Sequence, residues 1–166
     1  NNINVKIPQI SLMSEGEKKE LLVNRNNASL RTVTIDHMIH EQIAESAQRH
    51  PNARIFCGST ETSLVQLDRR ANQMAHFLLE SGITSESIVG IHLPRTLDLL
   101  TAMLAVFKAG GVCLPLDPDY PTERVSYMIS DSHAALILSH SSVSAEISDH
   151  HVPIYNLDAL TKQLSS

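Results

Sequence analysis

Two aspartates in a proline-rich stretch are the first candidates for chemistry. Asp117 and Asp119 are two positions apart, and paired carboxylates can serve as general acid and general base. Their neighbours favour another role, because Pro115, Pro118 and Pro121 restrict the backbone just before an expected helix. Aspartate side chains in such turns accept hydrogen bonds from nearby backbone N–H groups. We therefore interpret both aspartates as turn residues, with Asp119 helping to start the helix.

The same prolines raise a second hypothesis, since their spacing of three residues is that of a polyproline ligand. Leu114 and Leu116 flank the first proline and are expected to face a core. A rigid, buried turn is therefore the preferred interpretation.

Serine and histidine occur together at residues 139–142, which read SHSS. These are the residue types of a nucleophile and its base. Neighbouring residues in a polar loop rarely face one another, and the sequence shows no device for stabilising an oxyanion. We predict no catalytic residue here.

Nine histidines raise the question of a metal site. His37 and His40 are three residues apart in an expected helix, and His150 and His151 are adjacent. Neither pair has the companion ligands and spacing of a zinc site. We interpret them as scattered surface residues and predict no metal ligand.

Two glycine-containing segments were considered as phosphate loops. Residues 58–60 read GST, but Glu61 follows and the sequence has neither of the two common glycine fingerprints. A hairpin or a strand-to-helix turn is the better interpretation. Gly110 and Gly111 follow an expected helix rather than preceding one, so they are predicted to end it. The sequence therefore predicts no residue that binds a cofactor.

Composition limits the class of protein. The 166 residues carry a formal net charge of −5, and 42% of them are hydrophobic. The negative charge argues against a nucleic-acid partner, because proteins that bind nucleic acids present a basic face. No apolar run is long enough to span a membrane. Cys57 and Cys113 lie far apart in apolar runs, so we expect two unpaired core thiols. We expect a soluble, cytoplasmic protein, and the start at Asn1 rather than methionine indicates a segment of a longer one.

From residue 34 onwards, apolar residues alternate between helical and strand-like spacing. Expected helices cover about residues 34–49, 63–80, 96–109, 121–129 and 157–164, and expected strands cover residues 53–57, 88–93, 112–114, 134–138 and 152–155. The predicted N-caps of the first three helices are Thr34, Ser63 and Thr96, and Val33 is expected to form a hydrophobic staple at the first of them. Pro121 is placed at the first position of its helix. The alternation predicts an α/β fold built from parallel βαβ units.

Residues 1–33 are mostly polar. Ser14 precedes two glutamates and is predicted to cap a short helix whose apolar positions are Leu21, Leu22 and Val23. These apolar positions are too few to form a core. We therefore assign residues 1–33 as an interdomain linker.

These residues carry a resemblance to one family. Residues 107–124 read FKAGGVCLPLDPDYPTER, which closely resembles the second core motif of adenylation domains in nonribosomal peptide synthetases. Residues 62–67 read TSLVQL and look like the first core motif, and residues 39–41 read IHE, like the helix that opens such domains. Residues 12–23 resemble the linker that follows an upstream condensation domain. The sequence departs from the family at Leu64, Gln66 and Cys113, where tyrosine, glutamate and tyrosine are usual.

The resemblance implies a fold and an activity. Residues 34–166 would be part of the N-terminal adenylation subdomain of an adenylate-forming enzyme, within a synthetase that has a condensation domain upstream and the remaining adenylation or carrier domain downstream. A complete domain uses ATP and Mg²⁺ to activate an amino acid and passes it to a carrier-protein thiol. The family's phosphate loop, specificity pocket and catalytic lysine follow the matched segment. Lys108 belongs to the second core motif, whose contribution is structural.

The segment alone is therefore expected to be non-catalytic and to need no cofactor. An alternative is a natural truncated module that docks a neighbouring condensation or carrier domain. An enzyme half completed by a separate chain and an independent flavodoxin-like binding protein are the other hypotheses.

Overall fold

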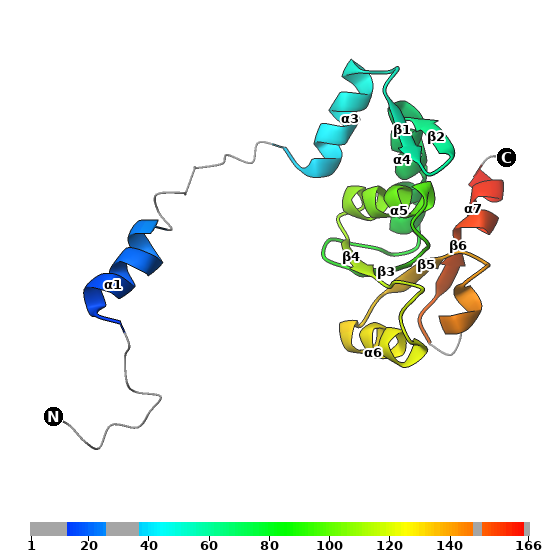
Figure 1. Cartoon of the computed structure of the whole chain (residues 1–166). Helices are drawn as coiled ribbons and strands as arrows, with labels where there is room; N and C mark the ends of the chain where they lie inside the picture. Colours follow the sequence, from blue (N-terminus) through cyan, green and yellow to red (C-terminus); the bar gives the residue numbers. More distant parts are fainter. Residues whose placement is uncertain (1–12, 26–36, 148–150, 165–166) are drawn as a thin grey trace. The chain divides into compact units, whose positions relative to one another are not determined.

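The computed structural model describes residues 13–25, 37–147 and 151–164 (Figure 1). The chain divides into two units, Asn1–Asp36 and His37–Ser166. In chain order the second unit contains α3 (Ile39–Arg49), β1 (Arg54–Cys57), β2 (Thr60–Ser63), α4 (Leu64–Glu80), β3 (Ile88–His92), α5 (Leu97–Lys108), β4 (Val112–Pro115), α6 (Thr122–Ser132), β5 (Leu136–Ser139), the 3-10 helix η3 (Ser144–Ile147), β6 (Ile154–Asn156) and α7 (Leu157–Leu164).

In the described residues 13–25 of the first unit, α1 (Glu15–Lys19) is continued by the π-helix η2 (Glu20–Asn24). Ser14 caps it as predicted: the Glu17 N–H donates to Ser14 Oγ at 3.2 Å, and the Ser14 N–H donates to the Glu17 carboxylate at 2.8 Å. The apolar residues of this segment are exposed, namely Met13, Leu21, Leu22 and Val23. The assignment of 1–33 as an interdomain linker stays a prediction.

The start of α3 differs from the prediction. Met38 has an extended backbone with φ −71° and ψ 156°, so the helix begins at Ile39. The reason is local, because the Met38 N–H donates to the Glu41 carboxylate at 2.7 Å and this contact fixes the first turn. The predicted cap Thr34 and staple Val33 lie outside the described residues. The end at His50 agrees with the prediction.

A β-hairpin connects α3 to α4. Strands β1 and β2 pair antiparallel, with Arg54 opposite Ser63 and Cys57 opposite Thr60. Gly58 has φ +59°, a conformation that favours glycine, at the turn between them. The hairpin interpretation of this glycine is therefore confirmed, but strand β2 itself was not predicted. Its polar sequence TETS lacks the apolar alternation that marks a strand.

Helix α4 begins with the predicted capping box. The Gln66 N–H donates to Ser63 Oγ at 3.1 Å, and the Ser63 N–H donates to Gln66 Oε1 at 3.3 Å. The helix ends at Ser81, followed by Gly82 with φ +90°. Residues that are close in the sequence thus determine both ends of α4.

Removing this cap has a measurable effect. The Ser63→Ala variant is expected to lose about 1 kcal/mol of unfolding free energy, because an N-terminal N–H of α4 loses its acceptor. Urea denaturation followed by circular dichroism measures the loss. The control is Ser59→Ala in the exposed hairpin turn, where a change within about 0.5 kcal/mol is expected. Equal losses in the two variants would argue against the capping role.

The core sheet has four parallel strands in the order β4-β3-β5-β6. Figure 1 shows α5 and α6 on opposite sides of this sheet. One side packs against α4 and α5 through fully buried residues such as Val89, Leu138 and Leu78. The other side packs against α6 and η3 through Ile137 and Ile129. The predicted α/β fold with parallel βαβ units is confirmed.

The motif at residues 107–124 links α5, β4 and α6. Gly110 has φ +78° and the Gly111 N–H donates to Val106 O at 2.9 Å, so these glycines end α5 as predicted. Pro121 occupies the N-cap position of α6 rather than its first helical position. Thr96 occupies the N-cap position of α5 but makes no side-chain cap; its hydroxyl donates to Pro94 O at 3.4 Å.

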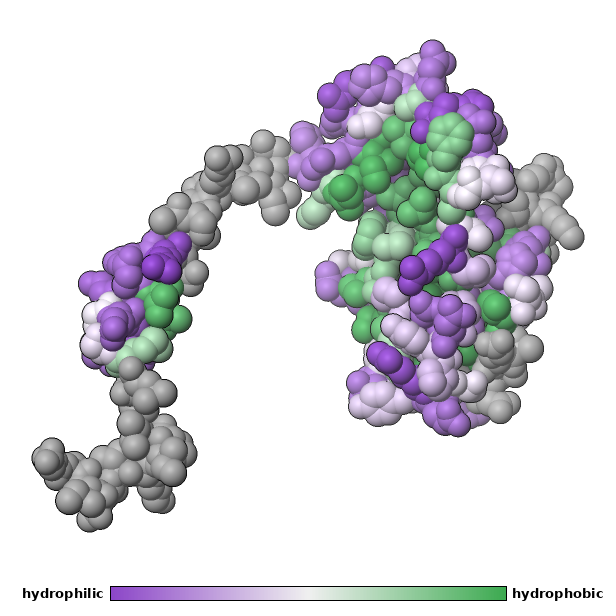
Figure 2. Space-filling model, in the orientation of Figure 1, coloured by the Kyte–Doolittle hydropathy of each residue, from purple (hydrophilic) through white to green (hydrophobic). Residues whose placement is uncertain are grey.

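Hydrophobic side chains also reach the surface of the second unit (Figure 2). The large ones with the highest exposure are Phe56, Tyr127, Met38, Ile39 and Leu79. Among the described residues, no helix combines the length and the apolar character needed to cross a lipid bilayer.

Candidate functional site

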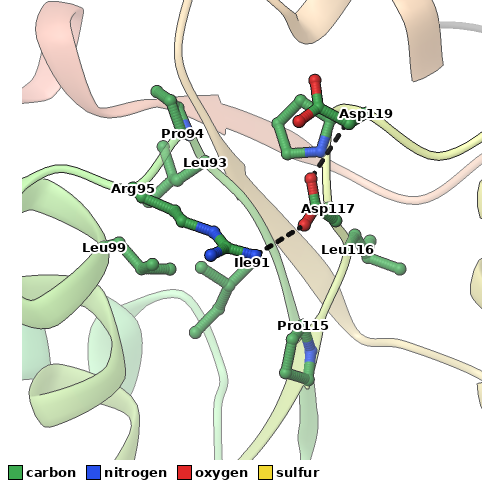
Figure 3. Close-up of a pocket in the computed structure, with 10 residues that line it drawn as sticks. Ile91, Leu93, Pro94, Arg95, Leu99, Pro115, Leu116, Asp117 and Asp119 are labelled. Atoms are coloured by element: carbon green, nitrogen blue, oxygen red, sulfur yellow. Dashed lines mark hydrogen bonds and ion pairs between the residues drawn. The ribbon is translucent and has the colours of Figure 1, made fainter.

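A pocket of about 440 Å³ opens at the carboxyl ends of β3 and β4. In parallel α/β sheets this edge is where ligands bind. Its apolar wall comes from Ile91 and Leu93 of the β3 segment, Leu99 of α5, Pro115 at the end of β4, and Leu116 after it. Figure 3 shows these side chains around the opening. The pocket is therefore built from the end of one strand, the start of the next helix and the proline-rich motif.

The proline-rich turn gives the pocket its polar rim. The Asp119 N–H donates to Asp117 Oδ1 at 3.0 Å, and the Tyr120 N–H donates to Asp117 O at 3.0 Å. Asp117 is thus a turn residue, as predicted. Pro121, the N-cap residue of α6, makes no side-chain cap. The contribution of Asp119 to the start of α6 stays a prediction.

An ion pair spans the pocket. Arg95 Nη2 lies 3.6 Å from Asp117 Oδ2, and Figure 3 shows the guanidinium reaching across from the β3 side. The Arg95 side chain is 90% exposed, so solvent screens this pair and it stabilises the fold by less than about 1 kcal/mol. With Asp119, the rim carries one cation and two carboxylates.

The pocket combines an apolar wall with a charged rim. Its ten lining residues include no histidine, cysteine, serine or lysine, so its ionisable side chains are those of Arg95, Asp117 and Asp119. An apolar wall beside a few charged groups suits the binding of a small apolar group or of another chain segment.

The SHSS loop forms contacts that the sequence did not predict. The Ser142 hydroxyl lies 2.9 Å from His140 Nδ1, so these two side chains do face one another. Asp158, at the start of α7, accepts from the Ser141 N–H at 3.1 Å, and hydrogen bonds from Ser141 hold the pKa of this carboxyl below its usual value. The carboxylate bonds to Ser141, and Ser141 and Ser142 are exposed, so the group lacks the order of a catalytic triad.

The remaining candidates lie apart from the pocket. Ser139 is fully buried and its hydroxyl donates to His92 O at 3.2 Å. His37 lies 3.7 Å from the Glu45 carboxylate on the surface. No group of three or more histidine, cysteine, aspartate or glutamate side chains is placed to hold a metal ion in the described ranges, and His150 lies outside them.

Lys108 lies at the far end of α5 from the pocket. Its ammonium is 2.9 Å from Asp68 Oδ1 of α4, and the two side chains are only 13% and 18% exposed. This contact joins two core helices. The role is structural, and the sequence pattern alone did not reveal the partner because Asp68 lies on a different helix.

Both cysteines have free, half-buried thiols, so the expectation of unpaired thiols is confirmed but full burial is not found. The Cys113 thiol lies 3.8 Å from Met103 O, and burial raises its pKa from the ordinary 9.0 to about 11. The folded protein thus keeps this thiol protonated to a higher pH than the unfolded chain does.

A pH dependence of stability follows from Cys113. The unfolding free energy is expected to fall as pH rises from 9.0 towards about 11, because the unfolded chain releases the proton first. Urea denaturation over this range measures the slope. The Cys113→Ala variant is expected to show a smaller slope of unfolding free energy against pH. The Cys57→Ala variant is expected to show the same slope as the unmodified chain. An unchanged slope in Cys113→Ala would contradict this explanation.

Comparison with known proteins gives one family match. Residues 43–165 match the family described as AMP-binding enzyme. Chondramide synthase cmdD from Chondromyces crocatus is 34% identical over 165 residues, which are 97% of this chain and 4% of that protein. Gramicidin S synthase 2 from Brevibacillus brevis is 36% identical over 147 residues, which are 88% of this chain and 3% of that protein. The chain thus spans a small part of the relatives that it matches.

Solved structures agree on the fold. A crystal structure of VinN has a TM-score of 0.72 at 17% identity, covering 78% of this chain and 35% of that one. The N-terminal subdomain of Klebsiella oxytoca NpsA, in complex with 3-hydroxyanthranilyl-AMSN, has a TM-score of 0.65 at 20% identity, covering 76% of this chain and 31% of that one. At these identities the likeness establishes the fold alone.

Proposed function

Because the chain belongs to the AMP-binding enzyme family, we propose that it is the N-terminal part of an adenylation domain in a nonribosomal peptide synthetase. The complete domain would join an amino acid to ATP, releasing pyrophosphate and forming an aminoacyl-adenylate. It would then load the amino acid onto a carrier-protein thiol. The observation that supports this most is the sequence of residues 107–124.

The contribution of this segment to the complete domain is structural. Residues 107–124 end α5, form β4 and place the turn before α6, so they fix one edge of the sheet. The same motif supplies the charged rim and part of the apolar wall of the pocket. The pocket lies at the ligand-binding edge of the sheet and is open, which suits contact with the rest of the domain.

The segment by itself is expected to be non-catalytic. Adenylate formation needs donors that stabilise the charge developing on the transferring phosphate. The resemblance assigns the phosphate loop and catalytic lysine to segments beyond those matched, and Lys108 is engaged with Asp68. ATP and Mg²⁺ would therefore be partners of the complete domain.

Amino-acid-dependent exchange of pyrophosphate into ATP tests the proposal. The longer protein, expressed from the reading frame that contains this segment, is expected to exchange pyrophosphate with one or a few amino acids, and the 166-residue chain is expected to show background exchange. No exchange by the longer protein with any proteinogenic amino acid, or exchange by the short chain, would count against it. The second result would specifically overturn the non-catalytic role.

A second candidate is a docking module for a neighbouring condensation or carrier domain. It is favoured by the exposed apolar residues Leu21, Leu22 and Val23 in the first unit, which are 43%, 59% and 43% exposed. A purified chain that is monomeric and unfolds cooperatively would support this candidate. Aggregation that the rest of the adenylation domain relieves would support the scaffold proposal instead.

A further inference from the structure

Three polar residues form one row across neighbouring parallel strands. His92 pairs with Ser139 and Ser139 pairs with Asn156, and each is the last residue of its strand. Paired residues in a parallel sheet point to the same face. Ile137 and Ile154, two residues earlier, pack in the cluster of α6 and η3. The polar row therefore lies at the carboxyl edge of that same face.

The hydrogen bonds of this row fix where its protons are. The Ser139 hydroxyl uses its single proton to donate to His92 O at 3.2 Å. His92 Nδ1 lies 3.0 Å from Leu116 O, and because a carbonyl oxygen only accepts, Nδ1 carries the proton. In the neutral ring Nε2 is then an acceptor. The His92 side chain is 1% exposed.

Two acceptors of the row have no partner. Within the part of the chain that the structure describes, His92 Nε2 and Asn156 Oδ1 are buried atoms without a hydrogen bond. Buried acceptors left unpaired destabilise a fold, and nearly all of them are paired in stable proteins. A group that satisfies both atoms has to donate two hydrogen bonds.

The chemistry of the row excludes most occupants. An anion offers no proton, and a divalent cation favours charged ligands, whereas this row supplies one imidazole nitrogen and neutral oxygens. Neither acceptor is open to the surface, so the occupant is small and enclosed. Strands are spaced about 4.8 Å apart, which puts the two outer backbones about 10 Å apart, with Ser139 of the middle strand between them on the same face. One water molecule suits such a site.

We propose that the carboxyl edge of the sheet holds a buried water molecule that donates to His92 Nε2 and Asn156 Oδ1. The row then becomes a continuous chain of hydrogen bonds from Leu116 O through His92 to β6. Leu116 lines the pocket, and His92 immediately precedes Leu93 and Pro94 of the pocket wall. His92 is thus a positioning residue that joins the two segments of the pocket through its bond to Leu116 O, and the water connects its ring to β6.

Measurements on the unmodified chain test this directly. Nitrogen-15 spectra of the His92 ring are expected to show the tautomer protonated at Nδ1, and a crystal structure is expected to show one ordered oxygen within about 3.2 Å of both acceptors. Cross-relaxation between water and the ring protons next to Nε2 gives the same information in solution. A proton on Nε2, a dry site, or direct contact between the Asn156 amide and the ring would overturn the proposal.

Variants separate the water from simple packing. Asn156→Leu removes the acceptor at similar volume and is expected to abolish the cross-relaxation signal at His92. Asn156→Asp keeps an oxygen there and is expected to retain the signal. The control Ser139→Ala removes the neighbouring hydroxyl but neither acceptor, and is also expected to retain it. Persistence of the signal in the Asn156→Leu variant would show that Asn156 does not hold the water. If a variant fails to fold, the measurements on the unmodified chain still test the proposal.

Discussion

Replacing Leu78 by alanine is expected to lower the free energy of unfolding by about 3–5 kcal/mol. Leu78 lies on α4 and is fully buried between this helix and the sheet, in the cluster with Val89 and Leu138. Truncation removes apolar contacts and leaves a cavity that the rigid strands cannot fill. Chemical denaturation measures the change.

The adjacent residue provides a matched control. Leu79 is on the same helix but 49% exposed, so Leu79→Ala makes the same chemical change outside the core. We expect it to cost less than about 1 kcal/mol. Losses of similar size at the two positions would mean that α4 does not pack on the sheet through the Leu78 side.

Replacing Lys108 by alanine is expected to cost about 2–4 kcal/mol. Lys108 and Asp68 form a contact at 2.9 Å between α5 and α4, with both side chains mostly shielded from water. Removing the ammonium leaves a shielded carboxylate without its counter-charge, which is more damaging than losing a surface pair. The double variant Lys108→Ala with Asp68→Ala is expected to recover part of the loss, since it removes the unpaired charge as well.

An exposed ion pair is the control for this prediction. Arg54 and Glu61 are only 2.6 Å apart across the hairpin, but their side chains are 55% and 40% exposed. Arg54→Ala is expected to cost much less than Lys108→Ala despite the shorter contact, because solvent screens the charges. If Lys108→Ala costs no more than Arg54→Ala, the structural role of Lys108 is wrong.

Local signals in the sequence predicted much of the fold. Ser63 and Gln66 marked the start of α4, Gly110 and Gly111 marked the end of α5, and the apolar runs marked β3 and β5. These features depend on residues near in sequence, so their pattern can be read without tertiary information.

Features that depend on tertiary contacts were missed. Strand β2 is polar and is defined by its pairing with β1. The start of α3 was placed too early, because the apolar spacing continued through Met38 although Glu41 binds its N–H. Apolar periodicity reports which face of a helix is buried and does not locate its first turn.

The candidate site was predicted in part. The motif containing Asp117 was recognised and its turn role was correct, but the pocket with Arg95 was not predicted. Arg95 and Asp117 follow different strands, and only the parallel pairing of β3 with β4 brings them together. The polar row of His92, Ser139 and Asn156 was missed for the same reason, since strand register is not visible in one sequence.

Isothermal titration of the 166-residue chain with Mg-ATP tests the central proposal most directly. If this chain is a scaffold segment, the rest of the domain supplies the phosphate-binding groups. No saturable heat of binding is then expected up to about 1 mM nucleotide, which corresponds to a binding free energy of roughly −4 kcal/mol. A folded sample, verified by circular dichroism, is required for this result to count. Saturable binding with a Kd in the micromolar range would contradict the account, because it would require a nucleotide site within this chain.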